Sequence, residues 1–295
     1  MIVANFSNNT FTMNNTSSNL TKEDSRCLLL IENVTVMTEH TAWFQVLLLS
    51  FGVLGVFANC LVIRAIVVLG QNQNQSIRIL MYLSMVDILS ALTSILRFIF
   101  AKFSHLVTCN VAGFMHIITI FSIYSSIYMF TVTAIDRYFK VHYLEDYELT
   151  FTPIRFQITL AWYALITLLQ TTLSVYFSFT YFMGYGSSYT LLINIAVILL
   201  TSILYAKSTF QLRRYKRMNE NLAENIQNII KITQIYLYLF ALYPIYMLTV
   251  VLMLRLKILT QSEEIFTKQI ATLVPCMAGL INAIYFFFSL TTKLE

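Results

Sequence analysis

The chain has 295 residues, of which 58% are hydrophobic and only 11% charged, and its formal net charge is +5. This composition excludes an ordinary soluble domain and indicates an integral membrane protein. Its apolar segments are far longer than the ten-residue alternating strands of a membrane β-barrel, so we expect the spanning elements to be α-helices. The positive charge indicates membrane topology and contact with anionic lipid, and no nucleic-acid partner is expected.

Residues 1–42 form a polar segment rich in Asn, Ser and Thr. Six glycosylation sequons begin at Asn5, Asn8, Asn14, Asn15, Asn19 and Asn33. Their density predicts a glycosylated extracellular tail. The alternative is an Asn-rich tail with accidental sequons. No basic and then apolar region precedes them, so we expect the first helix to direct targeting.

Seven stretches after the tail are long and apolar enough to cross a bilayer. They lie at about 43–69, 77–103, 107–141, 153–178, 187–217, 222–256 and 264–292, leaving 293–295 as a very short cytoplasmic end. The predicted fold is therefore an all-α, seven-transmembrane helix bundle over residues 43–292. With the tail outside, twelve Lys and Arg residues fall on the inner side and seven on the outer side. This asymmetry favours a multi-pass plasma-membrane protein with an extracellular N-terminus.

Polar residues inside these spans are the main candidates for functional residues. Asn59 in the first span and Asp87 in the second are costly in lipid, so both are expected to face the bundle interior. A lone Asn is most simply an interhelical hydrogen bond, whereas a mid-membrane Asp indicates a cation, a proton or a polar network. Asp136, Arg137 and Tyr138 end the third span at the membrane boundary. Taken alone, this triplet also fits an interfacial anchor, with Arg137 reaching the headgroups.

Later spans complete a pattern. The fourth carries Trp162, the sixth a single Pro244 that predicts a kink and hinge, and the seventh Asn282. In this order, over seven spans behind a glycosylated N-terminus, the set resembles the rhodopsin-like (class A) G-protein-coupled receptors. The resemblance covers residues 43–292.

The resemblance implies roles for individual positions. Asn59, Asp87, Ser126 and Asn282 match a buried sodium and water network, which makes Asp87 a candidate sodium ligand; no other cofactor is expected. Arg137 matches the arginine that holds the resting state, paired with Asp136 and Glu224, and then meets a heterotrimeric G protein. Tyr205 resembles the helix-five tyrosine that moves inward on activation, and Tyr285 lies near the place of the helix-seven tyrosine. Activation is expected to move helix six outward about Pro244.

Several positions depart from the family pattern. Leu242 stands where a Trp is usual, and Asn282 is followed by no proline, with Tyr285 one residue early. The usual bridge from helix three to the second outer loop cannot form, because residues 179–190 contain no cysteine. Cys27 and Cys109 both lie on the oxidising side, where they are expected to pair; the alternative is two free thiols.

The ligand is expected to bind the outer half of the bundle. Thr119 stands where amine receptors have Asp, and Cys276 where opsins have the retinal Lys, so neither ligand class is expected. The fifth span, 187–217, has no proline, and this absence together with that of the loop cysteine is similar to the melanocortin, lysophospholipid and cannabinoid group. The short loops are similar to those of odorant receptors. The predicted pocket residues are Arg97, Met115, Thr119, Ser122, Leu242, Tyr246, Thr272 and Cys276. Core or lipid-facing packing is the alternative for its apolar members.

Arg97 bears on the ligand's charge. If it faces the cavity, it favours an anionic group; alternatively, it reaches the outer headgroups. The ligand is therefore expected to be a small apolar or anionic molecule, a lipid or a peptide.

A chemosensory, odorant-like receptor of the same fold is one alternative. Two function classes other than receptors are also considered. A seven-helix transporter would need paired half-repeats, and the sequence shows none. A membrane enzyme would need a cluster of catalytic groups, but His40, His105, His116 and His142 are scattered and show no metal-ligand spacing. No enzymatic activity is expected.

Overall fold

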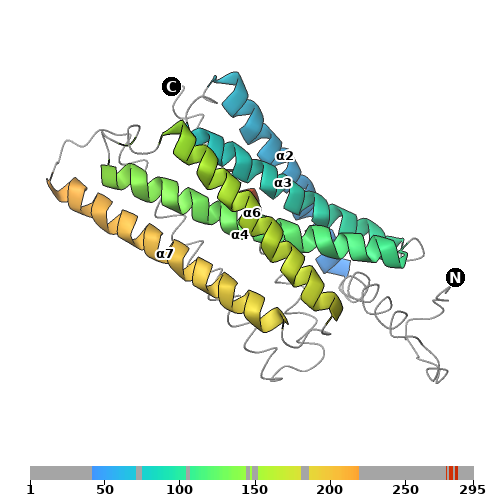
Figure 1. Ribbon diagram of the computed structural model, residues 1–295. Helices are drawn as coiled ribbons and strands as arrows, with labels where there is room; N and C mark the ends of the chain where they lie inside the picture. Colours follow the sequence, from blue (N-terminus) through green and yellow to red (C-terminus); the bar gives the residue numbers. More distant parts are fainter. Residues whose placement is uncertain are drawn as a thin grey trace, which may run out of the picture.

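The computed structural model describes residues 42–70, 75–103, 107–143, 147, 152–180, 186–218, 277, 279–281 and 283–284. Within these ranges the chain is all-helical and contains no β-strand. The five long helices are α2 (Ala42–Val68), α3 (Gln75–Lys102), α4 (Cys109–Tyr143), α6 (Pro153–Thr180) and α7 (Gly186–Met218) (Figure 1). Each begins and ends within two residues of the range that the sequence predicts.

Four of these helices are long and apolar enough to cross a membrane. The candidate spans are Trp43–Val68, Ile77–Phe100, Cys109–Tyr143 and Pro153–Tyr176, and α7 contains a shorter apolar stretch, Ile195–Gln211. They support the prediction of a helical membrane protein. The span predicted at 222–256 and the tail up to residue 41 lie outside the described residues, as does most of 264–292. The count of seven therefore stays a prediction.

Helix α4 is the centre of the arrangement. It packs against α3, α6 and α7, while α2 packs mainly against α3, and α6 also contacts α7. Figure 1 shows α2 and α3 side by side, with α4 lengthwise between them and α7. Gly70 ends the first helix, because its φ of 62° lies in the left-handed region that glycine adopts without strain. The short connection that follows makes α2 and α3 antiparallel neighbours.

The distribution of side chains is that of a protein in lipid. Buried positions include polar residues from every helix, such as Asn59, Asp87, Ser126, Gln170 and Thr201. Large apolar side chains point outward instead; they include Phe57, Leu54 and Val67 on α2 and Trp162, Leu165 and Leu168 on α6. Exposed apolar area of this extent is costly in water but suits contact with acyl chains.

Small residues bring α2 and α3 close together. A Cβ added at Gly52 would lie 2.8 Å from Cγ1 of Ile95 and 3.1 Å from the carbonyl oxygen of Ala91. One added at Gly55 would lie 3.2 Å from Cβ of Ala91. Such close backbone approach is typical of helix pairs in membranes. It holds the two helices that carry Asn59 and Asp87 in contact.

Candidate functional site

Asp136 and Arg137 lie near the end of α4 and are both buried, with 1% and 6% of their surfaces exposed. The helix continues through them to Tyr143. Consecutive residues of an α-helix point about 100° apart, so the two charged side chains face different neighbours. This separation decides which partner each of them finds.

Asp136 is held by a residue that follows the helix. The Tyr147 hydroxyl donates a short hydrogen bond to Oδ1 of Asp136. Lys140, one turn beyond Asp136, places its ammonium 5.7 Å from the centre of the Tyr147 ring. Tyr147 is itself buried. A charge-assisted hydrogen bond and a cation–π contact thus fasten Tyr147 to the end of α4.

Arg137 faces α7. Tyr205 of α7 is completely buried, and its hydroxyl interacts electrostatically with both Arg137 and Asp136. Within the described residues Arg137 forms no ion pair with Asp136, and its Nε atom has no hydrogen-bond partner. In this structure Oδ1 of Asp136 accepts from Tyr147, and the pairing of Asp136 with Arg137 in a resting receptor stays a prediction. The other expected partner, Glu224, lies outside the described residues.

A second polar cluster lies deeper in the bundle, where α2, α3 and α4 meet the short segment around Gly279. The Asn59 amide donates to the carbonyl oxygens of Gly55, at 2.9 Å, and of Gly279, at 3.4 Å. Asp87 packs directly on Gly279, since a Cβ added there would lie 3.0 Å from Cγ of Asp87. The hydroxyls of Ser90 and Ser126 are 3.3 Å apart and link α3 to α4.

The donor set of this cluster suits a sodium ion. It offers the buried carboxylate of Asp87 and the hydroxyls of the serine pair, and Oδ1 of Asn59 is buried without a hydrogen-bond partner. Oxygen atoms are the ligands that hard cations prefer. In contrast, the described part of the chain contains no group of three His, Cys, Asp or Glu residues that would hold a metal such as zinc.

The predicted outer pocket is described only at its α3 and α4 positions. Arg97 is half-buried and interacts electrostatically with His116 of α4, so this side chain faces its neighbouring helix. Met115 is buried in a packed cluster with Val107 and Ala112. The environment of Met115 is that of a core residue, which was the alternative to a pocket role.

Two hydroxyls of the predicted pocket form hydrogen bonds within their own helix. Thr119 donates to the carbonyl oxygen of Met115, at 2.7 Å, and Ser122 to that of Thr119, at 3.0 Å. Such bonds satisfy the hydroxyl locally. Neither residue needs a ligand to complete its hydrogen bonding.

Many predicted site residues lie outside the described residues, so their roles stay predictions. They are the six sequon asparagines, Cys27, Glu224, Leu242, Pro244, Tyr246, Thr272, Cys276, Asn282 and Tyr285. Cys109 is the first residue of α4, and its bridge to Cys27 stays a prediction for the same reason. Cys60 is exposed on α2 as a free thiol.

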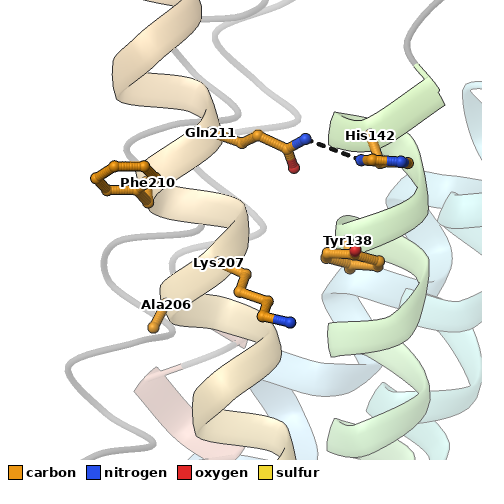
Figure 2. Close-up of a pocket in the computed structure, with 6 residues that line it drawn as sticks. All are labelled: Tyr138, His142, Ala206, Lys207, Phe210 and Gln211. Atoms are coloured by element: carbon orange, nitrogen blue, oxygen red, sulfur yellow. Dashed lines mark hydrogen bonds between the residues drawn. The ribbon is translucent and has the colours of Figure 1, made fainter.

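A groove between α4 and α7 was not predicted from the sequence. It is lined by Tyr138, His142, Ala206, Lys207, Phe210 and Gln211 and has a volume of about 490 Å³. Figure 2 shows Gln211 reaching across to His142, where Nε2 and Nδ1 are 2.8 Å apart. The His142 ring stacks on Tyr138, with ring centres 5.6 Å apart. Lys207 extends from α7 toward α4 beneath this bridge (Figure 2).

Sequence reasoning also missed Tyr147 as the partner of Asp136. The only signal was a tyrosine eleven residues after Asp136, in a segment too short to span the membrane. Comparison with known proteins adds no assignment to this geometry: no protein-family model matches the chain, and no curated protein matches it either.

Proposed function

We propose that the chain is a G-protein-coupled receptor of the rhodopsin-like type, which passes an extracellular ligand signal to a heterotrimeric G protein. The observation that carries this proposal is the position of Arg137. It is a buried guanidinium at the end of the central helix, beside the buried Tyr205, with no carboxylate partner among the described residues. A headgroup anchor would instead extend its charge to the surface.

Charge distribution supports the orientation. Connections α2–α3 and α4–α6 lie at one end of the bundle, together with the end of α7. Ten basic residues of the described helices lie toward that end: Arg64, Arg78, Arg137, Lys140, Arg155, Lys207, Arg213, Arg214, Lys216 and Arg217. Only Arg97 and Lys102 of the described helices lie toward the other end. By the positive-inside rule, the Arg137 end faces the cytoplasm and the N-terminus lies outside the plasma membrane.

The proposed mechanism depends on the free-energy cost of burying the Arg137 charge. A buried charge without a counter-charge is costly, and a partner that supplies hydrogen-bond acceptors relieves that cost. On activation, helix six moves outward about Pro244 and opens a cleft beside Arg137. The C-terminal helix of the G-protein α subunit then fills this cleft and its carbonyl groups accept from the guanidinium.

The ligand binds from the outside. Arg97 lies toward the outer end of α3 and interacts electrostatically with His116 of α4. Its guanidinium is the described group of that region best suited to an anion. This guanidinium favours a small molecule, lipid or peptide with an acidic group.

Nucleotide exchange tests the proposal. The full chain is reconstituted in lipid with a purified G protein, and GDP release is compared between the parent, Arg137→Ala and Arg155→Ala. Arg155 is the matched control, because it is exposed at the same end of the bundle on α6. We expect only Arg137→Ala to abolish the exchange that the parent stimulates.

One result would refute the receptor proposal. If the parent stimulates no exchange on a panel covering the major G-protein classes, either alone or with an acidic lipid library, the receptor proposal fails. Solute flux into vesicles holding the same protein would then favour a transporter.

A further inference from the structure

We propose that the groove between α4 and α7 binds the headgroup of an anionic phospholipid from the inner leaflet. The proposal uses the membrane orientation given above but does not depend on G-protein coupling. Its elements are the exposed cation of Lys207, the stacked rings of Tyr138 and His142, and apolar residues of α7 that lie toward the membrane.

Lys207 supplies the cation. It is exposed on α7. Figure 2 shows its ammonium directed into the space between α7 and α4, toward the ring of Tyr138. The wall on the α4 side is fixed, because Tyr138 stacks on His142 and Gln211 ties His142 to α7. A preorganised wall lowers the entropic cost of binding a charged group there.

The surrounding surface attracts anions. Asp87 and Asp136 are the acidic residues of the described ranges, and both are buried. Arg213 and Arg214 are exposed on α7, less than two turns beyond Lys207. No described carboxylate on the surface therefore competes for these cations. Each basic residue near the membrane surface contributes about 1 kcal/mol of attraction to anionic lipid, or roughly fivefold in affinity.

One face of α7 distinguishes a lipid from a free anion. Residues spaced by three or four along a helix share a face, and Leu200, Ile203, Lys207, Phe210 and Arg214 follow this spacing. All five are exposed, and Phe210 is 74% exposed. Lys207 lies about 6 Å along the axis from Ile203, and Arg214 about 10 Å further. Leu200 and Ile203 can therefore contact an acyl chain, while Lys207 and Arg214, which lie on either side of Phe210, can contact a phosphate.

Photo-cross-linking tests the proposal. The purified full chain is placed in phosphatidylcholine nanodiscs that contain a trace of diazirine-labelled phosphatidylserine or, separately, diazirine-labelled phosphatidylcholine. After irradiation, the labelled peptides are mapped. We expect phosphatidylserine to label the segments 138–142 and 206–211 several times more strongly than phosphatidylcholine does.

Variants define the cause. Lys207→Gln is expected to lower the phosphatidylserine label about fivefold, and Lys207→Arg to retain it. Arg64→Gln is the matched control, since Arg64 is an exposed basic residue at the same end of the bundle but on α2. It is expected to leave the label in the groove unchanged. Monodisperse elution and unchanged helicity of each variant show that the fold is retained.

Three outcomes would overturn the proposal. Equal labelling by the two lipids means that Lys207 only reaches the general headgroup layer. Equal labelling of the parent and Lys207→Gln means that the groove does not select charge. Displacement of the lipid by inorganic phosphate means that the groove is a site for a soluble anion. None of these measurements needs a G protein, so they are independent of receptor activity.

Discussion

Tyr147→Phe is the most specific perturbation of the Asp136 cluster. The change removes the hydroxyl that donates to Asp136 but keeps the ring under the Lys140 ammonium. A hydrogen bond to a charged group contributes roughly 1.5–3 kcal/mol, and Asp136 is too buried for water to replace the lost donor freely. We therefore expect the variant to lose about 2 kcal/mol of stability. For a chain of this size, that corresponds to a fall of roughly 4–8 °C in the unfolding midpoint.

The assay is thermal loss of monomer. The detergent-solubilised full chain is heated in steps, and the monomer that survives is measured by size-exclusion chromatography. Tyr143→Phe is the matched control, because Tyr143 is exposed and contacts Phe139 through its ring. In a double-mutant cycle, Tyr147→Phe combined with Asp136→Asn should cost less than the sum of the two changes. Equal midpoints for Tyr147→Phe and Tyr143→Phe would refute this account of Asp136.

Sodium chloride should raise the unfolding midpoint of the parent relative to choline chloride, because a bound ion stabilises the state that binds it. Asp87→Asn should remove this difference. An equal sodium effect in both proteins would exclude Asp87 as a ligand. Gly279→Ala should cost about 1–3 kcal/mol of stability by overpacking against Asp87 and so lower the unfolding midpoint. Gly113→Ala should leave the midpoint unchanged, because its Cβ would meet nothing within 4 Å. Equal midpoints for the two variants would show that the Asp87 side chain moves aside without cost. Asn74-Gln75-Ser76 is a further sequon, and Asn74 lies in the connection between α2 and α3 that is proposed to face the cytoplasm. Glycopeptide mapping should find glycans in the tail and none on Asn74, and a glycan on Asn74 would reverse the proposed orientation.

The sequence predicts the helices well because the length of each apolar run largely decides where a helix forms. A backbone in lipid must satisfy its own hydrogen bonds, so an apolar run of sufficient length has to be a helix. The bounds of α2, α3, α4 and α6 therefore follow mainly from apolar length, whereas the apolar stretch of α7, Ile195–Gln211, is shorter than its helix. The same argument correctly places Asn59 and Asp87 in the interior, because neither side chain is tolerated against acyl chains.

Partners across helices are harder to predict. Helical periodicity tells which face a residue shares but not which neighbour covers that face. Met115 therefore fits a pocket or a core equally well in the sequence, and only packing against Val107 and Ala112 reveals its core environment. Tyr147 reaches Asp136 through the path of a connection, which no periodic pattern encodes.

The two adjacent charged residues at the end of α4 have different roles. Because the helix turns by about 100° per residue, the side chains of Asp136 and Arg137 leave α4 in different directions. Asp136 accepts from Tyr147 and joins the helix to the segment that follows it, so its charge is already engaged in the fold. Arg137 lies near Tyr205, which also interacts electrostatically with Asp136, and the Nε atom of Arg137 has no hydrogen-bond partner among the described residues. If the two had formed an ion pair, each would have cancelled the other's attraction for a third group. Their separation leaves the cation able to respond to an arriving partner, which is the property that the proposed receptor function requires.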